Sequence, residues 1–157
     1  MGTVSELREA LLSMDIRGKV TELNKSHSKE FLSANKNQMW DGQKPDGSDI
    51  TPSYLNDPYF KTRKQAEGYA NWKMKLSRNP KRNKYAPNLY INGYFYSTLT
   101  LNAVDLAIEI NDGFGKSVAS DHPGVLGVSQ ENLKNIAEGG YVDEFWKYVE
   151  EVTGLKV

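Results

Sequence analysis

Two histidines and a scatter of acidic residues are the side chains with which this 157-residue chain could carry out acid–base or metal chemistry. Asp121 and His122 are adjacent, and neighbouring residues of an extended segment point in different directions, so they do not predict a pair that shares a proton. His27 falls on or near the apolar stripe of a predicted helix, which favours a structural role. Neither histidine has further ligands at the spacing of a zinc site, and the lack of cysteine excludes a thiolate ligand or nucleophile.

The acidic residues do not form a recognisable site either. Asp41, Asp46 and Asp49 lie in a loop-like stretch, but their spacing of five and three differs from the alternating ligands and final glutamate of an EF-hand. Asp105 and Glu109 fall on the exposed face of a predicted strand and could pair as glycosidase carboxylates. Any acidic strand face offers the same pattern, so it does not indicate a glycosidase.

Sequence motifs for nucleotide or acyl chemistry are absent. The chain contains no GxSxG, P-loop or GxGxxG pattern. GFGKS at residues 113–117 has part of a phosphate-binding loop but lacks its first glycine, so we expect a turn that ends a strand. The sequence therefore predicts a protein that is not an enzyme, with no catalytic, cofactor-binding or metal-binding residues and no cofactor.

Charge is distributed unevenly along a chain whose net charge is zero. Residues 61–84 contain nine lysines and arginines and one acid, whereas residues 102–157 contain ten acids and four lysines. Such runs are often solvated faces, but they also suit association of the basic segment with the acidic end of another copy or with a nucleic acid. Aromatic residues interleave with the basic ones, as on single-strand-binding surfaces. The candidate contact residues are Lys61, Arg63, Lys64, Lys73, Lys75, Arg78, Lys81, Arg82 and Lys84.

The elements that would position these residues predict an α+β fold in one domain, residues 1–157. Residues 87–112 are rich in aromatic and β-branched types and predict an antiparallel β-hairpin at the centre of a small sheet. In this prediction the first strand begins near Leu89, the turn falls at Asn102-Ala103, and the second strand covers residues 104–110. Helices at the N-terminus, in the middle and at the C-terminus would pack around the sheet.

The remaining segments follow from periodicity and turn residues. Residues 1–34 predict N-terminal helices, the second capped by Asp15, and residues 59–86 a basic helix beginning at Asp57-Pro58 and a linker. Residues 113–157 predict C-terminal helices, one of which stops at Gly139-Gly140. No apolar run suits a signal peptide or a membrane span, so we expect no membrane contact. Residues 35–58 predict an extended loop, and its anchors would be Trp40, Ile50 and Tyr54.

Two short motifs resemble the virion-morphogenesis and tail-completion proteins of tailed phages, a family of head–tail joining and tail-terminator-like structural proteins. The family has a strand with a Leu-x-x-x-Gly-x-(aromatic or Leu)-x-Ser pattern, and later a Leu-Gly-(Leu/Val)-Ser-x-Glu helix start. The family's usual Pro-x-Arg before the Leu-Gly is replaced by Pro123-Gly124-Val125. The matching residues here are Leu89, Gly93, Phe95 and Ser97, then Leu126, Gly127, Ser129 and Glu131.

This resemblance implies a non-enzymatic structural protein of the virion, assembled in the host cytoplasm. Members of the family form homo-oligomeric rings at the head–tail connector or tail end, so the implied partners are copies of this chain and phage neck, portal or tail proteins. The alternative is a nucleic-acid-binding accessory protein that uses the basic segment 61–84, which would make DNA a partner as well.

Overall fold

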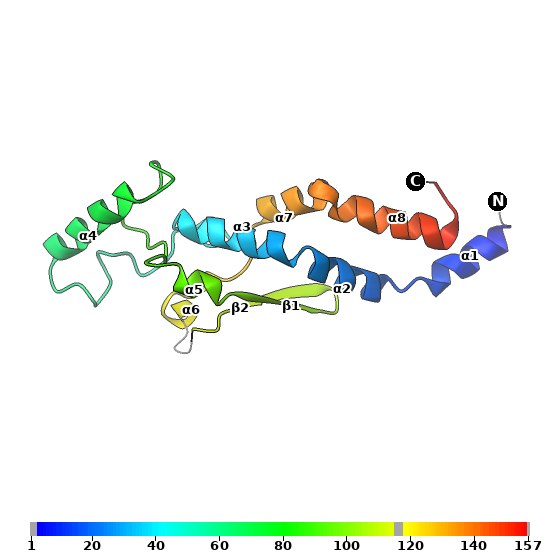
Figure 1. The fold of residues 1–157 in the computed structure, drawn as a ribbon, viewed down its shortest axis with the longest axis horizontal. Coiled ribbons are helices and arrows are strands. Elements are labelled where there is room, and N and C mark those ends of the chain that lie inside the picture. The colour runs from blue at the N-terminus through cyan, green and yellow to red at the C-terminus, as the bar shows by residue number, and fades with distance from the viewer. Residues whose placement is uncertain (1–2, 115–117, 157) are drawn as a thin grey trace.

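The computed structural model describes residues 3–114 and 118–156, which form an elongated molecule (Figure 1). α1 (Val4–Ser13) and α8 (Val142–Thr153) lie at one end, and α4 (Arg63–Lys75) lies at the other. The accessible surface is 10213 Å², whereas a compact protein of 17.7 kDa would expose about 8,000 Å². The chain therefore exposes much more surface than a compact subunit of its size.

The N-terminal helices begin where side chains can cap them. Thr3 and Glu6 form a capping box before α1, and the Asp15 carboxylate accepts a hydrogen bond from Gly18 N at 2.9 Å at the start of α2 (Ile16–Ser26). His27 separates α2 from α3 (Ser28–Trp40), which continues in nearly the same direction (Figure 1). The predicted N-cap at Asp15 is confirmed.

The predicted start of the loop at residue 35 is wrong, because α3 continues to Trp40. Asparagines and the turn residues that follow lowered the helical signal of this segment, but two of its amide side chains make tertiary hydrogen bonds. Asn35 is fully buried and its Nδ2 donates to Val125 O at 2.8 Å. Gln38 Nε2 donates to Gly127 O at 3.2 Å. These contacts stabilise the last turns of α3 despite weak intrinsic propensity.

The sheet is a hairpin of β1 (Thr100–Val104) and β2 (Ala107–Asn111), paired antiparallel with Leu101 opposite Ile110. The α+β class, with helices around a small antiparallel sheet, is confirmed. The predicted turn at Asn102-Ala103 is wrong, because both residues lie within β1 and the two-residue turn is Asp105-Leu106.

The predicted strand from Leu89 is also wrong before residue 100. Residues Tyr94–Ser97 form a short helix, α5, which Gly93 precedes in a left-handed conformation (φ 81°). Phe95 and Tyr96 are both buried, and successive residues of a strand face opposite sides. A helical turn lets both rings enter the core, and this burial outweighs the β propensity of the segment.

α4 begins at Arg63, later than the predicted start at Asp57-Pro58. The Asp57 carboxylate instead accepts a hydrogen bond from Tyr59 N at 2.9 Å and holds a turn. Thr62 and Gln65 then form a second capping box, which fixes the start of the helix.

The C-terminal segment contains α6 (Val118–Asp121), α7 (Gln130–Ile136), a π-turn η1 (Ala137–Tyr141) and α8. α7 ends at Ile136, and Gly140, with φ 132°, has a non-helical conformation that kinks the chain before α8, so the predicted helix stop at Gly139-Gly140 is confirmed. Tyr141 Oη donates to Asn24 Oδ1 at 2.8 Å and so ties this bend to α2. The turn predicted for residues 113–117 falls largely on 115–117, outside the described residues.

Two apolar clusters hold the fold together. The larger is built around Met39, Ile50 and Val125, and the smaller contains Tyr54, Ala66 and Ala70. Ile50, with no exposed surface, joins the larger cluster, while Tyr54 joins the smaller one beneath α4. The loop between α3 and α4 therefore connects the body of the molecule to α4 through buried side chains.

None of the helices in the described residues combines the length and the apolar composition that a membrane crossing requires.

Candidate functional site

A cleft of about 570 Å³ opens beside α4, and we call it the aromatic cleft. α4 and residues 57–60 contribute to its lining from one part of the chain, while the 87–92 loop, α5 and α6 contribute from another. Its volume falls within the range of ligand-binding clefts. Aromatic residues dominate the lining, among them Tyr59, Phe60, Tyr69, Trp72, Tyr90 and Phe114.

Ring packing fixes the α4 side of the cleft. Tyr54 meets Tyr69 edge to face with centroids 5.1 Å apart, Phe60 lies 5.2 Å from Tyr69, and Tyr69 lies 5.5 Å from Trp72. Burial raises the pKa of Tyr54 to about 12. Burial also raises the pKa of Tyr69. Both phenols are therefore neutral at ordinary pH, and the wall suits an apolar or cationic group.

Lys73 lines the cleft but is only 3% exposed, so its charge is not part of an exposed basic surface, contrary to the prediction. It follows Ala66 and Ala70 on the inner face of α4, and its ammonium donates to Tyr90 O. Burial, and then the charge of Arg82, lowers the pKa of Lys73 to about 8. The group ties α4 to the 87–92 loop.

Arg82 corrects the predicted contact set in the same way. It is 7% exposed, and its Nη1 donates to Trp40 O at 3.3 Å. This bond joins the segment after α4 to the end of α3, and burial of the guanidinium removes it from any contact surface.

The other candidate basic residues lie nearer the surface. Arg63 pairs with Glu67 at 2.7 Å, and Lys84 Nζ lies 4.8 Å from the centre of the Tyr85 ring. Of these remaining candidates in the described part of the chain, four exposed lysines have no ion-pair partner. They are Lys61, Lys64, Lys75 and Lys81.

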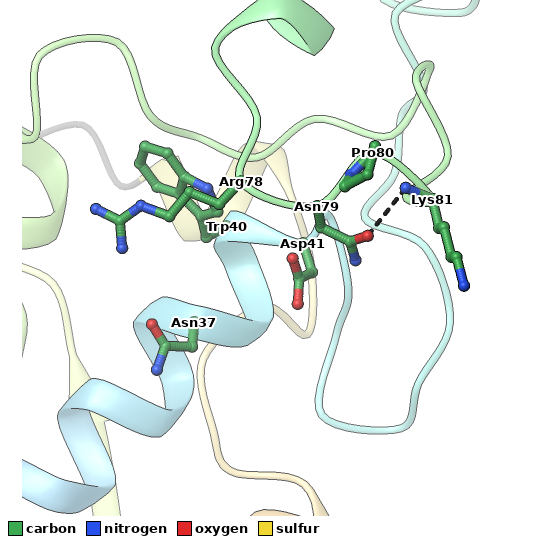
Figure 2. Close-up of a pocket in the computed structure, with 7 residues that line it drawn as sticks. All are labelled: Asn37, Trp40, Asp41, Arg78, Asn79, Pro80 and Lys81. Carbon is green, nitrogen blue, oxygen red and sulfur yellow. Dashed lines mark hydrogen bonds between the residues drawn. The ribbon is translucent and has the colours of Figure 1, made fainter.

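Arg78 belongs to a second, more open hollow of about 480 Å³ at the end of α3. Figure 2 shows it beside Trp40, and its guanidinium lies 4.8 Å from the centre of a Trp40 ring. Lys81 N donates to Asn79 Oδ1 at 3.0 Å within a local turn that lines the hollow (Figure 2). Trp40 thus holds the segment after α4 through its ring as well as through its carbonyl.

Both histidines have structural partners. His122 Nδ1 lies 2.9 Å from Thr51 O, and buried His27 lies 2.8 Å from a Glu30 oxygen and 3.1 Å from a Glu144 oxygen. Burial alone would lower the pKa of His27, but the hydrogen bonds and charges of the two glutamates outweigh it and raise that pKa. His27 therefore joins α3 to α8.

No convergent catalytic set appears in the described residues. The described part of the chain contains no group of three or more metal-binding side chains. Asp57, Asp121 and His122 line the aromatic cleft, but no hydrogen bond between them is present there to orient an acid–base pair.

The first set of motif residues surrounds α5 rather than a strand. Leu89 has a positive φ of 54° in the preceding loop, Gly93 caps α5, and Phe95 is buried. Ser97 Oγ donates to Tyr94 O at 2.7 Å. The strand that the family pattern implied for these residues is therefore a loop and a helical turn.

The second set lies at the start of α7, as the helix-start motif predicts. Ser129 caps α7 by accepting from Asn132 N at 3.2 Å, and Glu131 is exposed in the first turn. Leu126 packs against the larger core cluster. Gly127 has φ 136°, and a Cβ there would lie 3.1 Å from Pro45 Cγ, so glycine is required at this position.

The opposite end of the molecule carries acidic groups and exposed apolar side chains, and we call α1 and α8 together the acidic end. These two helices contain six carboxylates and two cations. Val4 is 86% exposed, Leu12 71% and Trp146 43%. The sequence showed the excess of acidic residues in the 102–157 segment, but it gave no sign that the apolar side chains of α1 remain exposed.

Comparison of the chain with protein-family models, with curated proteins and with solved structures returned no match. Membership of a phage structural family therefore stays a prediction.

Proposed function

We propose that the protein is a non-enzymatic structural subunit that assembles end to end with copies of itself. In the setting that the motif resemblance implies, the assembly is a ring at the head–tail connector or tail end of a phage virion, where it joins neck and tail proteins. The observation that carries the proposal is the placement of complementary features at opposite ends. α4, with its exposed lysines and aromatic cleft, lies far from the acidic end (Figure 1).

Two different surfaces on one subunit form a heterologous interface, which gives a closed ring when the rotation between neighbours closes. Opposite charge at the two ends favours this orientation over contacts between like ends. The accessible surface of 10213 Å² exceeds that of a compact protein of this mass by about 2,000 Å². An excess of that size is comparable with the total area buried in a standard protein interface, about 1,600 Å².

The test is the mass of the purified full-length chain in solution, alone and with neck or tail proteins. We expect a discrete oligomer, and we expect the double charge reversal Lys61→Glu with Lys64→Glu to weaken it. Lys29→Glu is the matched control, because Lys29 is exposed on α3, away from both ends. Monomers under both conditions, with no ring in assembled particles, would contradict the proposal.

The second candidate function is binding of nucleic acid by the exposed lysines of the 61–84 segment. The favouring observation is that Tyr59, 80% exposed, and Trp72, 47% exposed, lie near Lys61, Lys64 and Lys75. Four lysines that neutralise phosphates would give a slope of roughly −3.6 in log affinity against log salt on duplex DNA. Retention on DNA that does not change with salt would contradict this candidate.

A further inference from the structure

We propose that α1 of one copy docks in the aromatic cleft of the next copy. This inference rests on the end-to-end assembly proposed above and names the segment and the cleft that make the contact. The exposure of α1, the spacing of the residues on its outer face and the lining of the cleft support this docking.

α1 buries little of its surface against its own chain. It has ten residues, and none of them is buried. An isolated helix of this length is marginal in water, since most helical stability in proteins comes from packing of an apolar face. Packing against α8 and the bond from Asp15 N to Tyr148 Oη (2.9 Å) hold α1 in place, yet Val4 and Leu12 remain mostly exposed. A partner that packs against α1 can therefore bury these two side chains.

The outer face of α1 has the spacing of a helix that binds in a groove. Val4, Arg8, Leu11 and Leu12 follow the pattern i, i+4, i+7 and i+8, which places them on one face. Leu11 is 48% exposed. The face is thus an aliphatic strip with one cation in its centre.

The aromatic cleft complements this strip. Tyr59 (80% exposed) and Ile91 (78% exposed) offer apolar surface along its edge, and the rings behind them form an apolar wall. Asp57 and Asp121 also line the cleft and can accept hydrogen bonds from the Arg8 guanidinium. A guanidinium is in addition attracted to aromatic faces.

Charges beside the two surfaces set the orientation. Glu9 lies beside Leu12 at the edge of the aliphatic strip on α1, while Lys61 and Lys64 lie close to the cleft residues Tyr59 and Phe60 in sequence. Docking brings unlike charges together, whereas contact between two acidic ends or two basic ends brings like charges together, which costs free energy.

The contact must join different copies. α1 and α4 lie at opposite ends of the long axis, so α1 cannot reach the cleft of its own chain in this structure (Figure 1). Each copy then uses one end as donor of the helix and the other as acceptor, as a ring requires.

The test uses two variants that each block one end. Val4→Asp with Leu12→Asp blocks the helix, and Tyr59→Asp with Ile91→Asp blocks the cleft. All four side chains are at least 71% exposed, so neither change should affect folding, which circular dichroism would check. Val104→Asp is the control, because Val104 is an equally apolar, 61% exposed residue at the hairpin tip.

We expect each blocked variant alone to be a monomer, and an equimolar mixture to form a dimer with one copy of each. In that dimer the intact helix of one variant occupies the intact cleft of the other, and the two blocked ends stop growth. Val104→Asp should assemble like the wild type. If either blocked variant alone assembled to the same extent as the wild type, the docking would be overturned and the proposed function would still stand.

Disulfide cross-linking gives an independent readout because the chain has no cysteine. A mixture of Leu12→Cys and Ile91→Cys proteins, oxidised with a glutathione buffer, should form a mixed disulfide-linked dimer, whereas Val104→Cys with Ile91→Cys should not. Absence of the first cross-link in a wild-type-like oligomer would overturn the docking. A wild type that stays monomeric at every concentration, alone and with its partners, would overturn the proposed function and the docking together.

Discussion

Removal of the buried charge at Lys73 should change the pH dependence of stability in a defined way. Burial lowers the pKa of Lys73 from 10.5 to about 8. The unfolded chain therefore keeps a proton that the native protein has lost between these two values, so stability rises with pH in this window. A difference of about 2.5 pKa units corresponds to about 3 kcal/mol in total, of which about 2 kcal/mol falls between about pH 7 and about pH 9.5.

Lys73→Met is the informative variant, because methionine is similar in length and has no charge. The free energy of unfolding of both proteins would be measured by urea denaturation at a series of pH values. The wild type should gain about 2 kcal/mol relative to the variant between about pH 7 and about pH 9.5. The lost hydrogen bond to Tyr90 O offsets the two curves by a nearly constant amount, and the other ionisable groups are common to both proteins. A difference between the two proteins that does not change with pH would refute the assignment of Lys73 as a buried, perturbed ammonium.

Further predictions concern the contacts that hold the long axis and the loop. Two carboxylates stabilise protonated His27 in the native state, so its contribution to stability is present below its unfolded pKa of 6.5 and is lost as pH rises through the raised native value; His27→Gln should abolish this loss in denaturation measured on both sides of neutrality. Gly42→Ala should destabilise by about 2 kcal/mol, because Gly42 has φ 77° and a Cβ would meet Ala86 Cβ at 2.9 Å. Gly68→Ala, with open space around it in α4, should instead stabilise by about 0.5–1 kcal/mol; an equal effect of the two changes in thermal melts would contradict this account of the glycines.

The sequence was informative where local chemistry decides the structure. The N-cap Asp15 and the second strand of the hairpin follow from a capping residue and from periodicity, and the structure has them close to the predicted positions. These features depend on residues that are near one another in the chain.

Local chemistry was insufficient where tertiary contacts decide the structure. Phe95 and Tyr96 have strong β propensity, yet both rings enter the core from a helical turn. Asn35 looks like a loop residue, but its amide satisfies Val125 O inside the protein. Neither outcome can be derived without knowing which distant segments pack together.

The candidate site shows the same division. The basic character of the 61–84 segment was evident, but the position of Lys73 on the inner face of α4 became clear only with the packing of Tyr54 from the preceding loop. The aromatic cleft draws its lining from segments more than 60 residues apart, between Tyr54 and Asp121. A periodicity argument treats such segments separately and cannot bring them together.

The central claim is that unlike ends of neighbouring copies meet. A cryo-electron microscopy map of the assembled full-length protein, at a resolution that shows helices, tests it most directly. We expect a closed ring in which the acidic end of each copy contacts α4 of the next, with a helix in the aromatic cleft. A map in which like ends meet, or a preparation that contains only monomers in the presence of neck and tail proteins, would contradict it.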